Sequence, residues 1–379
     1  MSEPEFNKIR PYNSKEIQEA IPRIIANPQF HKLMDYLYPP EKHQVILEEL
    51  QNVKSAQDFQ RVITLPAIQG IISKTSDGLT SSGFEQLSKD EHYVFIGNHR
   101  DITLDSSMLG MLQLKHGFAT SQITWGNNLM VSELIVDLGK CNQMITVFRE
   151  GSPKEMLVNS QMLSGYIRNV VVEENKTVWI AHRKGRAKNG YDLTDVSILK
   201  MLSLSRKADV KSGLTELNIV PVTVSYELEP CGAMKVREIY LSQKENYVKD
   251  KDEDFKSIIG GATLPKGRIH YSIGKPINNE IQKLDDSLNK NELVDEVAKI
   301  IDKQMYRNYH LWPTNYLAYD LLEQSERFAD QYDEKAHKQL DERLALAMEA
   351  VEADSDEIKK LFYQMYANPV YNKLKTVSL

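Results

Sequence analysis

Residues 144–181 carry the pattern that decides the fold: MITVFREGSPKEMLVNSQMLSGYIRNVVVEENKTVWIA. The stretch begins and ends with a short apolar run, which is typical of a buried strand. Between the runs, Ser152 is placed to cap a helix, Pro153 stands where no helical N–H is needed, and Glu155 completes a capping box. One face of this helix would then carry Met156, Met162, Leu163, Tyr166 and Ile167. Strand, helix and strand in this order predict an α/β sheet with parallel members.

Similar apolar runs extend this pattern in both directions. We predict strands at residues 93–96, 144–148, 177–181, 219–226, 237–241 and 268–273. The segments before about Gln86 and after about Asn291 instead carry apolar residues at helical spacing. The predicted fold class is therefore α/β, with a mixed, largely parallel sheet, flanking helices, and helical N-terminal and C-terminal regions.

These changes in pattern divide the chain into three predicted regions. We expect a helical N-terminal domain at 1–86, an α/β domain at 87–290 and a helical C-terminal extension at 291–379. Residues 78–83, which are rich in glycine, serine and threonine, are the best candidate for a linker between the first two.

Composition indicates a globular protein of the cytoplasm. The chain has 379 residues, 41% of them hydrophobic, and its net charge of -6 gives no overall attraction to nucleic acid or to an anionic membrane. Its two cysteines suit a reducing compartment, and the N-terminus lacks the features of a secretory signal. The longest charge-free run, residues 117–132, contains polar side chains and is too short to span a bilayer. We expect a cytoplasmic protein, with a peripheral position on the inner face of the cell membrane as an option.

Three of the predicted strands end in side chains that can handle a proton or an anion. The first runs into His99, with Asp101 and Asp105 close behind, the second into Arg149, and the third into a basic loop. Because the carboxyl ends of neighbouring parallel strands open onto one crevice, these residues are expected to converge. A carboxylate on one ring nitrogen of His99 would leave the other free to accept a proton, although the same pair also fits a structural histidine.

The basic loop follows the strand at 177–181. Its basic residues are Arg183, Lys184, Arg186 and Lys188. Gly185 and Gly190 would let the backbone approach a ligand, whereas the alternative is a solvated loop. Since planar guanidinium groups suit bidentate contacts to phosphate, Arg149 on another strand end favours a phosphorylated substrate, with a hydroxyl that His99 would activate.

The order of these motifs resembles the glycerolipid acyltransferases, the family of glycerol-3-phosphate and 1-acylglycerol-3-phosphate (lysophosphatidate) acyltransferases. Four blocks within about 95–226 carry the resemblance, at residues 98–105, 145–149, 185–190 and 219–222. In this family the first block pairs a histidine with an aspartate, and the second ends a strand with arginine. The third carries glycine and arginine for phosphate, and the fourth is a strand with an internal proline, here Pro221.

The resemblance implies roles for the matching residues. His99 would be the general base, and Arg149, the basic loop and Pro221 would bind substrate. The family's aspartate lies five positions after the histidine, where this chain has Leu104, so that Asp101 and Asp105 are the candidates. We favour Asp105, because Asp101 is better placed to cap the following helix.

The resemblance also implies the reaction partners. The donor would be an acyl thioester, either acyl-CoA or acyl-carrier protein, and the acceptor glycerol 3-phosphate, a lysophospholipid or an acylated amino acid. The chain has no H-E-x-x-H, C-x-x-C or G-x-S-x-G pattern, so we expect no metal, no cofactor and no acyl-enzyme. A competing class is a non-catalytic module that binds phospholipid or acyl carrier, with His99 in a structural role.

Residues 195–204 raise a separate question about membranes. Ile198, Leu199 and Leu202 would share one face of a helix, and basic residues follow at Arg206, Lys207 and Lys211. Such a segment could lie in the headgroup plane, and we predict weak, salt-sensitive binding to anionic vesicles through it. The alternative is a core helix that ends in a basic turn.

Overall fold

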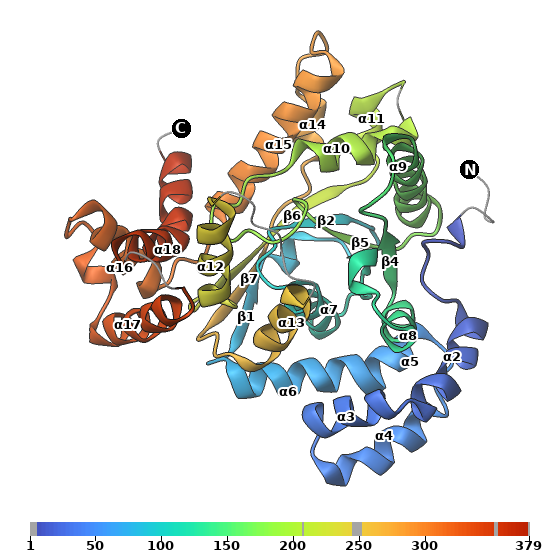
Figure 1. Ribbon diagram of the computed structural model, residues 1–379. Helices are drawn as coiled ribbons and strands as arrows, with labels where there is room; N and C mark the ends of the chain where they lie inside the picture. Colours follow the sequence, from blue (N-terminus) through green and yellow to red (C-terminus); the bar gives the residue numbers. More distant parts are fainter. Residues whose placement is uncertain (1–5, 207, 245–251, 352–354, 378–379) are drawn as a thin grey trace.

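The computed structural model describes residues 6–206, 208–244, 252–351 and 355–377. Its centre is a seven-stranded sheet in the order β1-β7-β6-β2-β5-β3-β4 (Figure 1). The strands are β1 (Leu79–Ser82), β2 (Val94–Gly97), β3 (Gln122–Gly126), β4 (Met144–Val147), β5 (Val178–Ala181), β6 (Ile219–Tyr226) and β7 (Ile269–Ile273). All neighbouring pairs are parallel except β6 and β7. The prediction of a mixed, largely parallel α/β fold is confirmed.

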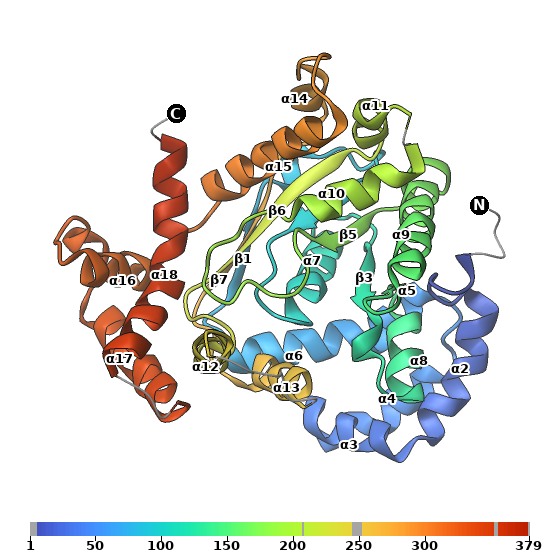
Figure 2. The same cartoon turned by 45° about the horizontal axis from the view of Figure 1, so that its top comes forward.

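Helices cover both faces of the sheet (Figure 2). One face packs against α9 (Pro153–Arg168), α10 (Val196–Ser203), α11 (Val210–Thr215) and α15 (Lys290–Arg307). The other face packs against α6 (Leu65–Thr75) and α7 (Leu104–Lys115). Alternate residues of β2 divide between the two cores, since Val94 and Ile96 belong to the first and Phe95 to the second.

The N-terminal helices form a third apolar cluster. They are α2 (Ser14–Ala26), α3 (Pro28–Leu37), α4 (His43–Leu50) and α5 (Ala56–Phe59), with the 3₁₀ turn η1 (Pro40–Lys42) and the π-helical segment η2 (Gln60–Thr64). Their apolar faces pack against Leu134 and Cys141 of α8 (Glu133–Cys141), the helix between β3 and β4. The N-terminal helices are therefore joined to the sheet layer through α8.

The C-terminal helices form a fourth cluster with α12 (Gly232–Ser242). They are α16 (Pro313–Glu323), α17 (Glu334–Glu349) and α18 (Ser355–Val377). The remaining elements are η3 (Phe84–Gln86), η4 (Asn127–Leu129), η5 (Asn169–Glu173), η6 (Leu204–Arg206), α13 (Glu253–Thr263), α14 (Asn278–Gln282) and η7 (Ala329–Gln331). The predicted boundaries of the three sequence regions stay a prediction.

The helix predicted between the second and third apolar runs is present as α9. Ser152 accepts a hydrogen bond from the backbone N–H of Glu155 at 3.4 Å, and the Glu155 carboxylate accepts one from the backbone N–H of Ser152 at 2.8 Å. This reciprocal pair satisfies two of the amide groups that a helix leaves unpaired at its start.

The strand predicted at residues 237–241 is wrong, because this segment belongs to α12. Ala233, Val236 and Tyr240 recur at helical spacing and face the C-terminal helices, which supply the surface that α12 packs against. The linker predicted at 78–83 is also wrong, since it contains β1, whose four residues pair with β7. Strand β3 lies within the charge-free run at 117–132 and was not among the predicted strands.

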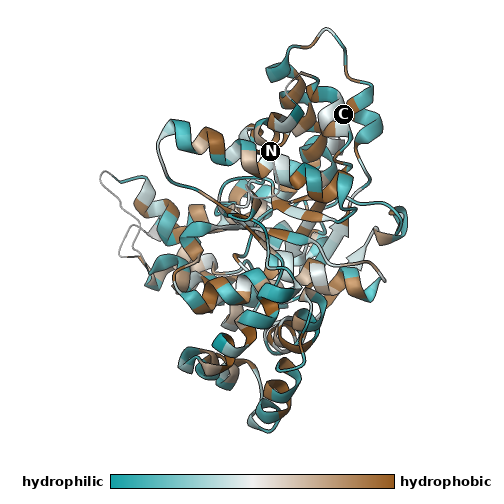
Figure 3. Cartoon of the chain, turned by 90° about the vertical axis from the view of Figure 1, so that its right-hand side faces the viewer, coloured by the Kyte–Doolittle hydropathy of each residue, from teal (hydrophilic) through white to brown (hydrophobic). Residues whose placement is uncertain are grey.

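The segment considered as a membrane contact is a core helix. Leu199 is 0% exposed and Leu202 is 1% exposed, and both belong to the cluster between α9, α10 and the sheet. Arg206 pairs with Glu216 and Lys211 with Asp286, whereas Lys207 lies outside the described residues. The prediction that this face of α10 binds lipid is therefore wrong. Helices of the described chain mix apolar and polar residues (Figure 3), and none has the length and hydrophobicity needed to cross a bilayer.

Candidate active site

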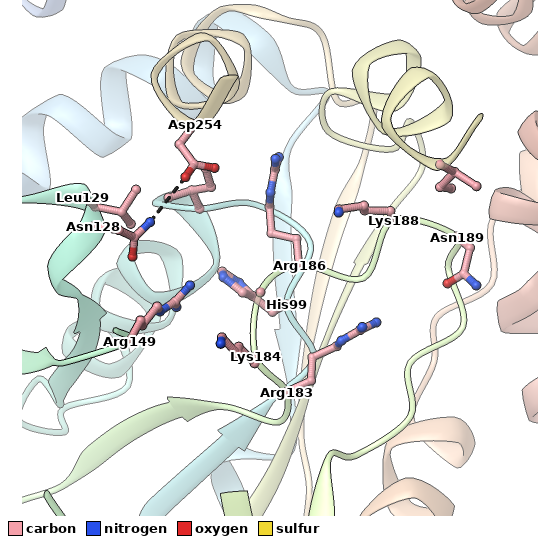
Figure 4. A pocket seen from close by; sticks show the side chains of 13 residues that line it. His99, Asn128, Leu129, Arg149, Arg183, Lys184, Arg186, Lys188, Asn189 and Asp254 are labelled. Atoms are coloured by element: carbon pink, nitrogen blue, oxygen red, sulfur yellow. Dashed lines mark hydrogen bonds between the residues drawn. The ribbon is translucent and has the colours of Figure 1, made fainter. Parts of the chain in front are cut away.

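Residues from three strand ends line one cavity of about 350 Å³ (Figure 4). His99 follows β2, Arg149 follows β4, and the loop from Arg183 to Lys188 follows β5. The other lining residues are Ile102, Asn128, Leu129, Asn189, Ile239 and Asp254. The expected convergence at the carboxyl edge of the sheet is therefore present in the structure.

His99 is held by Asp105. The Nδ1 atom of His99 lies 3.0 Å from Oδ2 of Asp105, which sits in the first turn of α7. Since an ionised carboxylate only accepts hydrogen bonds, Nδ1 carries the proton in this pair and Nε2 is the basic nitrogen. The His99 residue is 9% exposed and lines the cavity, whereas Asp105 is fully buried.

The Asp105 carboxylate is fixed by three further donors. Its Oδ2 accepts the backbone N–H groups of Arg100 at 2.6 Å and Asp101 at 2.9 Å, and its Oδ1 accepts the hydroxyl of Tyr226 at 2.8 Å. Burial, reinforced by the negative charge of Asp105, raises the pKa of Tyr226 well above its ordinary value, so the hydroxyl stays protonated and donates. These contacts hold the carboxylate in one orientation before any ligand binds.

Asp101 has a different place. Its Oδ1 accepts the backbone N–H groups of Thr103 at 2.9 Å and Leu104 at 2.8 Å, at the start of α7. Within the described residues, its hydrogen bonds go to this helix start and none goes to His99. Of the two candidate aspartates, the structure brings Asp105 to the histidine.

The basic side chains of the loop differ in their exposure and in their partners. Lys188 forms an ion pair with Glu238 at 2.5 Å, while Lys184 is exposed at the cavity wall. Arg186 is 8% exposed; its Nη2 donates to the hydroxyl of Ser257 at 3.0 Å, and its buried Nη1 has no hydrogen-bond partner. Because buried guanidinium groups are normally paired, the unpartnered Nη1 indicates a place for an anionic ligand. Gly185 has φ +76°, which allows the sharp turn between the cations.

Arg149 lies across the cavity from this loop and packs over β3. A side chain at Gly126 would put its Cβ 2.6 Å from Nε of Arg149, so it would force the guanidinium out of its present position. Burial lowers the pKa of Arg149, and the negative charge of Asp254 opposes that shift. An arginine stays charged in either case, so Arg149 adds a partly desolvated cation to the cavity.

A second, apolar cavity of about 330 Å³ adjoins the first. It runs between β3, β4, β5, α9 and α10, with walls that include Trp125, Val147, Phe148, Met156, Leu163, Ile180 and Met201. The two cavities share His99, Ile102, Leu129, Arg149, Arg183 and Lys184. His99 therefore lies where a cationic cavity meets an apolar one.

Pro221 does not join this group. It sits inside β6 opposite Ile96, where its carbonyl accepts the backbone N–H of Gly274 at 2.8 Å, and it lines neither cavity. Its position indicates a part in the sheet and not in a ligand contact.

Next to the site lies a buried network of ion pairs that our sequence-based prediction does not contain. Arg100 pairs with Asp192 at 2.7 Å and with Glu229 at 2.8 Å, and Glu229 also pairs with Lys235 at 2.5 Å. Tyr309 donates to Asp192 at 2.7 Å. The rule that ligands gather at strand ends would have pointed to Tyr226 and to Glu229 just after it, because β6 was predicted, whereas Asp192 lies in a loop with no such signal.

His182 lies on the buried side of the basic loop. Both ring nitrogens lack hydrogen-bond partners, and burial lowers its pKa to about 4, so the ring is neutral at physiological pH. Cys141 and Cys231 are buried and free. Over the described ranges, no group of three or more histidine, cysteine and acidic side chains is arranged to hold a metal ion.

Comparison with known proteins gives only a distant structural similarity. No protein-family model and no curated protein matches this chain. Among solved structures, it is similar to the 1-acyl-sn-glycerophosphate (LPA) acyltransferase PlsC from Thermotoga maritima, with 12% sequence identity and a TM-score of 0.37. The match covers 76% of this chain and 92% of that chain. Similarity at this level does not bear on substrate or reaction, which depend on the site residues.

Proposed function

We propose that this protein is an acyltransferase that moves a fatty acyl group from a thioester to the hydroxyl of a phosphorylated glycerol acceptor. One observation carries the proposal: His99, whose Nδ1 is held by Asp105, lines both a cationic and an apolar cavity. The apolar cavity suits an acyl chain, and the cationic cavity suits a phosphate. A donor and an acceptor bound in this way would meet at His99.

The proposed step needs only a general base. Nε2 of His99 takes the proton of the acceptor hydroxyl while its oxygen attacks the thioester carbonyl carbon. The C–S bond then breaks, and the proton passes from His99 to the leaving thiolate, which gives an ester and a free thiol. Asp105 orients the ring and stabilises the imidazolium, as a carboxylate does for histidine bases in general.

The cations on both sides of His99 would hold the acceptor. Arg149 and Arg186 would bind its phosphate, with Arg183 and Lys184 adding positive charge, so that the hydroxyl is kept close to Nε2. The proposed donor is acyl-CoA or acyl-carrier protein, and the proposed acceptor is a glycerol phosphate or a lysophospholipid. The reaction would serve phospholipid synthesis.

The test is acceptor-dependent thiol release. Purified protein is incubated with an acyl-CoA, a thiol-trapping dye and glycerol 3-phosphate, and the ester product is identified by mass spectrometry. His99→Ala is expected to lower the rate by about 10²- to 10⁴-fold, because a general base contributes on that scale. The matched control is His31→Ala, an exposed histidine of the N-terminal helices.

Two results would overturn the proposal. If no thiol is released with glycerol 3-phosphate or with lysophosphatidate, while the protein still binds acyl thioester or phospholipid, it is a binding module and not an enzyme. If His99→Ala retains activity within about tenfold of the unmodified protein, His99 is not the base.

A further inference from the structure

The cationic cavity contains one carboxylate that the proposed reaction does not use. Asp254 lies in the first turn of α13 and lines the cavity together with five basic side chains of the strand-end loops. A carboxylate placed there weakens the attraction for phosphate in its own vicinity, so it works against anion binding at that end of the cavity. A neutral polar group of the ligand therefore suits that end of the cavity better than a second anion.

Asp254 is joined to a second polar side chain. Nδ2 of Asn128, in η4 after β3, donates a hydrogen bond to Oδ2 of Asp254 at 3.3 Å. A carboxylate offers about four acceptor positions, and the amide of Asn128 retains a carbonyl and a second N–H. Figure 4 shows His99 between this pair and the side chains of Lys184 and Arg183. Neutral hydroxyl groups suit the pair, because they can donate to Asp254 and also interact with Asn128.

The cavity volumes set a second condition on the acceptor. The apolar cavity that reaches His99 is about 330 Å³, and the proposed donor chain would occupy it. Another cavity of about 550 Å³ lies between α12, α13, α17 and α18, but it shares no lining residue with the cationic cavity. The bonds of Arg186 with Ser257 and of Lys188 with Glu238 stand between the two. Of these cavities, only the one proposed for the donor chain would offer an acyl chain on the acceptor apolar walls next to His99.

We infer that Asp254 and Asn128 recognise a second, free hydroxyl of the acceptor, so that the site selects a phosphorylated polyol over its acylated form. The inference rests on the proposed function, because it assigns the groups of one acceptor to different parts of the proposed active site. The cations would bind the phosphate, His99 would activate the reacting hydroxyl, and Asp254 with Asn128 would bind the neighbouring hydroxyl. An acyl group on the neighbouring oxygen removes the proton that Asp254 would accept and places a chain against polar walls.

The experiment compares two small acceptors that differ in this hydroxyl. Glycerol 3-phosphate carries it, whereas 3-hydroxypropyl phosphate lacks it, and both have the same charged group at the same distance from the terminal hydroxyl. We expect the unmodified protein to prefer glycerol 3-phosphate by about 10- to 100-fold in kcat/KM, the effect of a hydrogen bond to a charged group. Asp254→Ala should bring the ratio close to one, and Asn128→Ala should lower it. Any general change in phosphate attraction cancels in the ratio.

Asp252→Ala is the matched control, because it removes a carboxylate next to the same helix that does not line the cavity. The ratio should stay unchanged in this variant. Affinities of both phosphates are also measured by calorimetry without donor, so that recognition is tested apart from transfer. Lysophosphatidate is assayed as a third acceptor and should be used at least tenfold less efficiently than glycerol 3-phosphate.

The outcomes separate the two proposals. Transfer without any preference between the two small phosphates, or a preference that Asp254→Ala leaves intact, overturns the inference while the proposed function stands. If no transfer occurs but binding still favours glycerol 3-phosphate and loses that preference in Asp254→Ala, the inference stands and the proposed function fails. Equal binding of the two phosphates in the absence of transfer overturns both.

Discussion

Oδ2 of Asp105 lies 3.0 Å from Nδ1 of His99, six positions earlier in the chain. The backbone between them carries the turn from β2 into α7, and the N–H groups of Arg100 and Asp101 point back to the same carboxylate oxygen. The turn therefore folds around Asp105. Asp101, only two residues from the histidine, is turned away to the start of α7.

The first prediction separates the two aspartates. Asp105→Asn should lower kcat/KM by about 10²-fold or more, because an amide can present N–H to Nδ1 and favour the wrong tautomer of His99. Asp101→Asn should stay within about threefold, since an asparagine also accepts helix N–H groups well. The measurement is the thiol-release rate of both variants, with folding checked by thermal unfolding. The reverse ranking would give the orienting role to Asp101.

The second prediction concerns Arg186 and the shape of its guanidinium. Arg186→Lys keeps the charge but loses the planar fork, one arm of which is bound to Ser257 while the other is unpartnered. We expect KM for the acceptor to rise by about tenfold, with KM for the acyl donor unchanged. Arg61→Lys, at an exposed position of the N-terminal helices, is the control.

A change in donor KM would contradict this assignment. It would show that the basic loop holds the phosphates of the thioester donor. The same two KM values measured for Arg149→Lys show whether the arginine across the cavity binds the same ligand group as Arg186.

The third prediction tests whether α10 belongs to the core. Leu199→Ala should lower the free energy of unfolding by about 2 to 5 kcal/mol, because it leaves a cavity at a fully buried position. Leu157→Ala is the matched control, since Leu157 on α9 is 51% exposed and its truncation should change stability by about 0.5 kcal/mol or less. Urea unfolding of both variants gives the comparison. Equal effects would reopen the lipid-facing interpretation of α10.

The parts of the fold that the sequence predicts are those with strong local signals. The capping box of α9 and the apolar runs of β2, β4, β5 and β6 are encoded within a few residues of each element. Strand β1 has no such signal, because its sequence LTSS alternates little in hydrophobicity and its place in the sheet comes from pairing with β7. The segment 237–241 was mistaken for a strand because its helical partner surface comes from residues more than 70 positions later.

The residues of the candidate site also differ in how well the sequence predicts them. His99, Arg149 and the basic loop follow predicted strands, so the rule on strand ends finds them. Asp254 and Asn128 come from a helix start and a short turn that pack together only in the folded chain, and no spacing in the sequence relates them. Asp192 reaches Arg100 across a separation of 92 residues. Such long-range partners depend on tertiary packing, which periodicity does not report.

Two buried groups near the basic loop make stability depend on pH in opposite directions. Asp302 of α15 accepts the backbone N–H of Thr194 at 2.9 Å and its hydroxyl at 2.6 Å, and burial raises the pKa of Asp302 to about 6. Burial lowers the pKa of His182 to about 4. Between about pH 4 and 6, the folded state therefore binds the proton of Asp302 that the unfolded state has lost. His182 behaves in the opposite way in this range, because it is neutral in the folded state and still protonated in the unfolded state. The two contributions to the slope of stability against pH offset each other.

The last prediction uses Asp302→Asn to remove one of these contributions. The stabilisation from protonated Asp302 is complete below about pH 4 and is lost as pH rises through about 6. The asparagine keeps an oxygen for Thr194 but does not titrate. Relative to the unmodified protein, Asp302→Asn should therefore gain stability as pH rises from 4 to 7. The gain is at most about 3 kcal/mol, from the shift of the Asp302 pKa from 3.8 to about 6. Urea unfolding across this range measures it, and a difference that does not change with pH would show that Asp302 is ionised in the folded protein throughout.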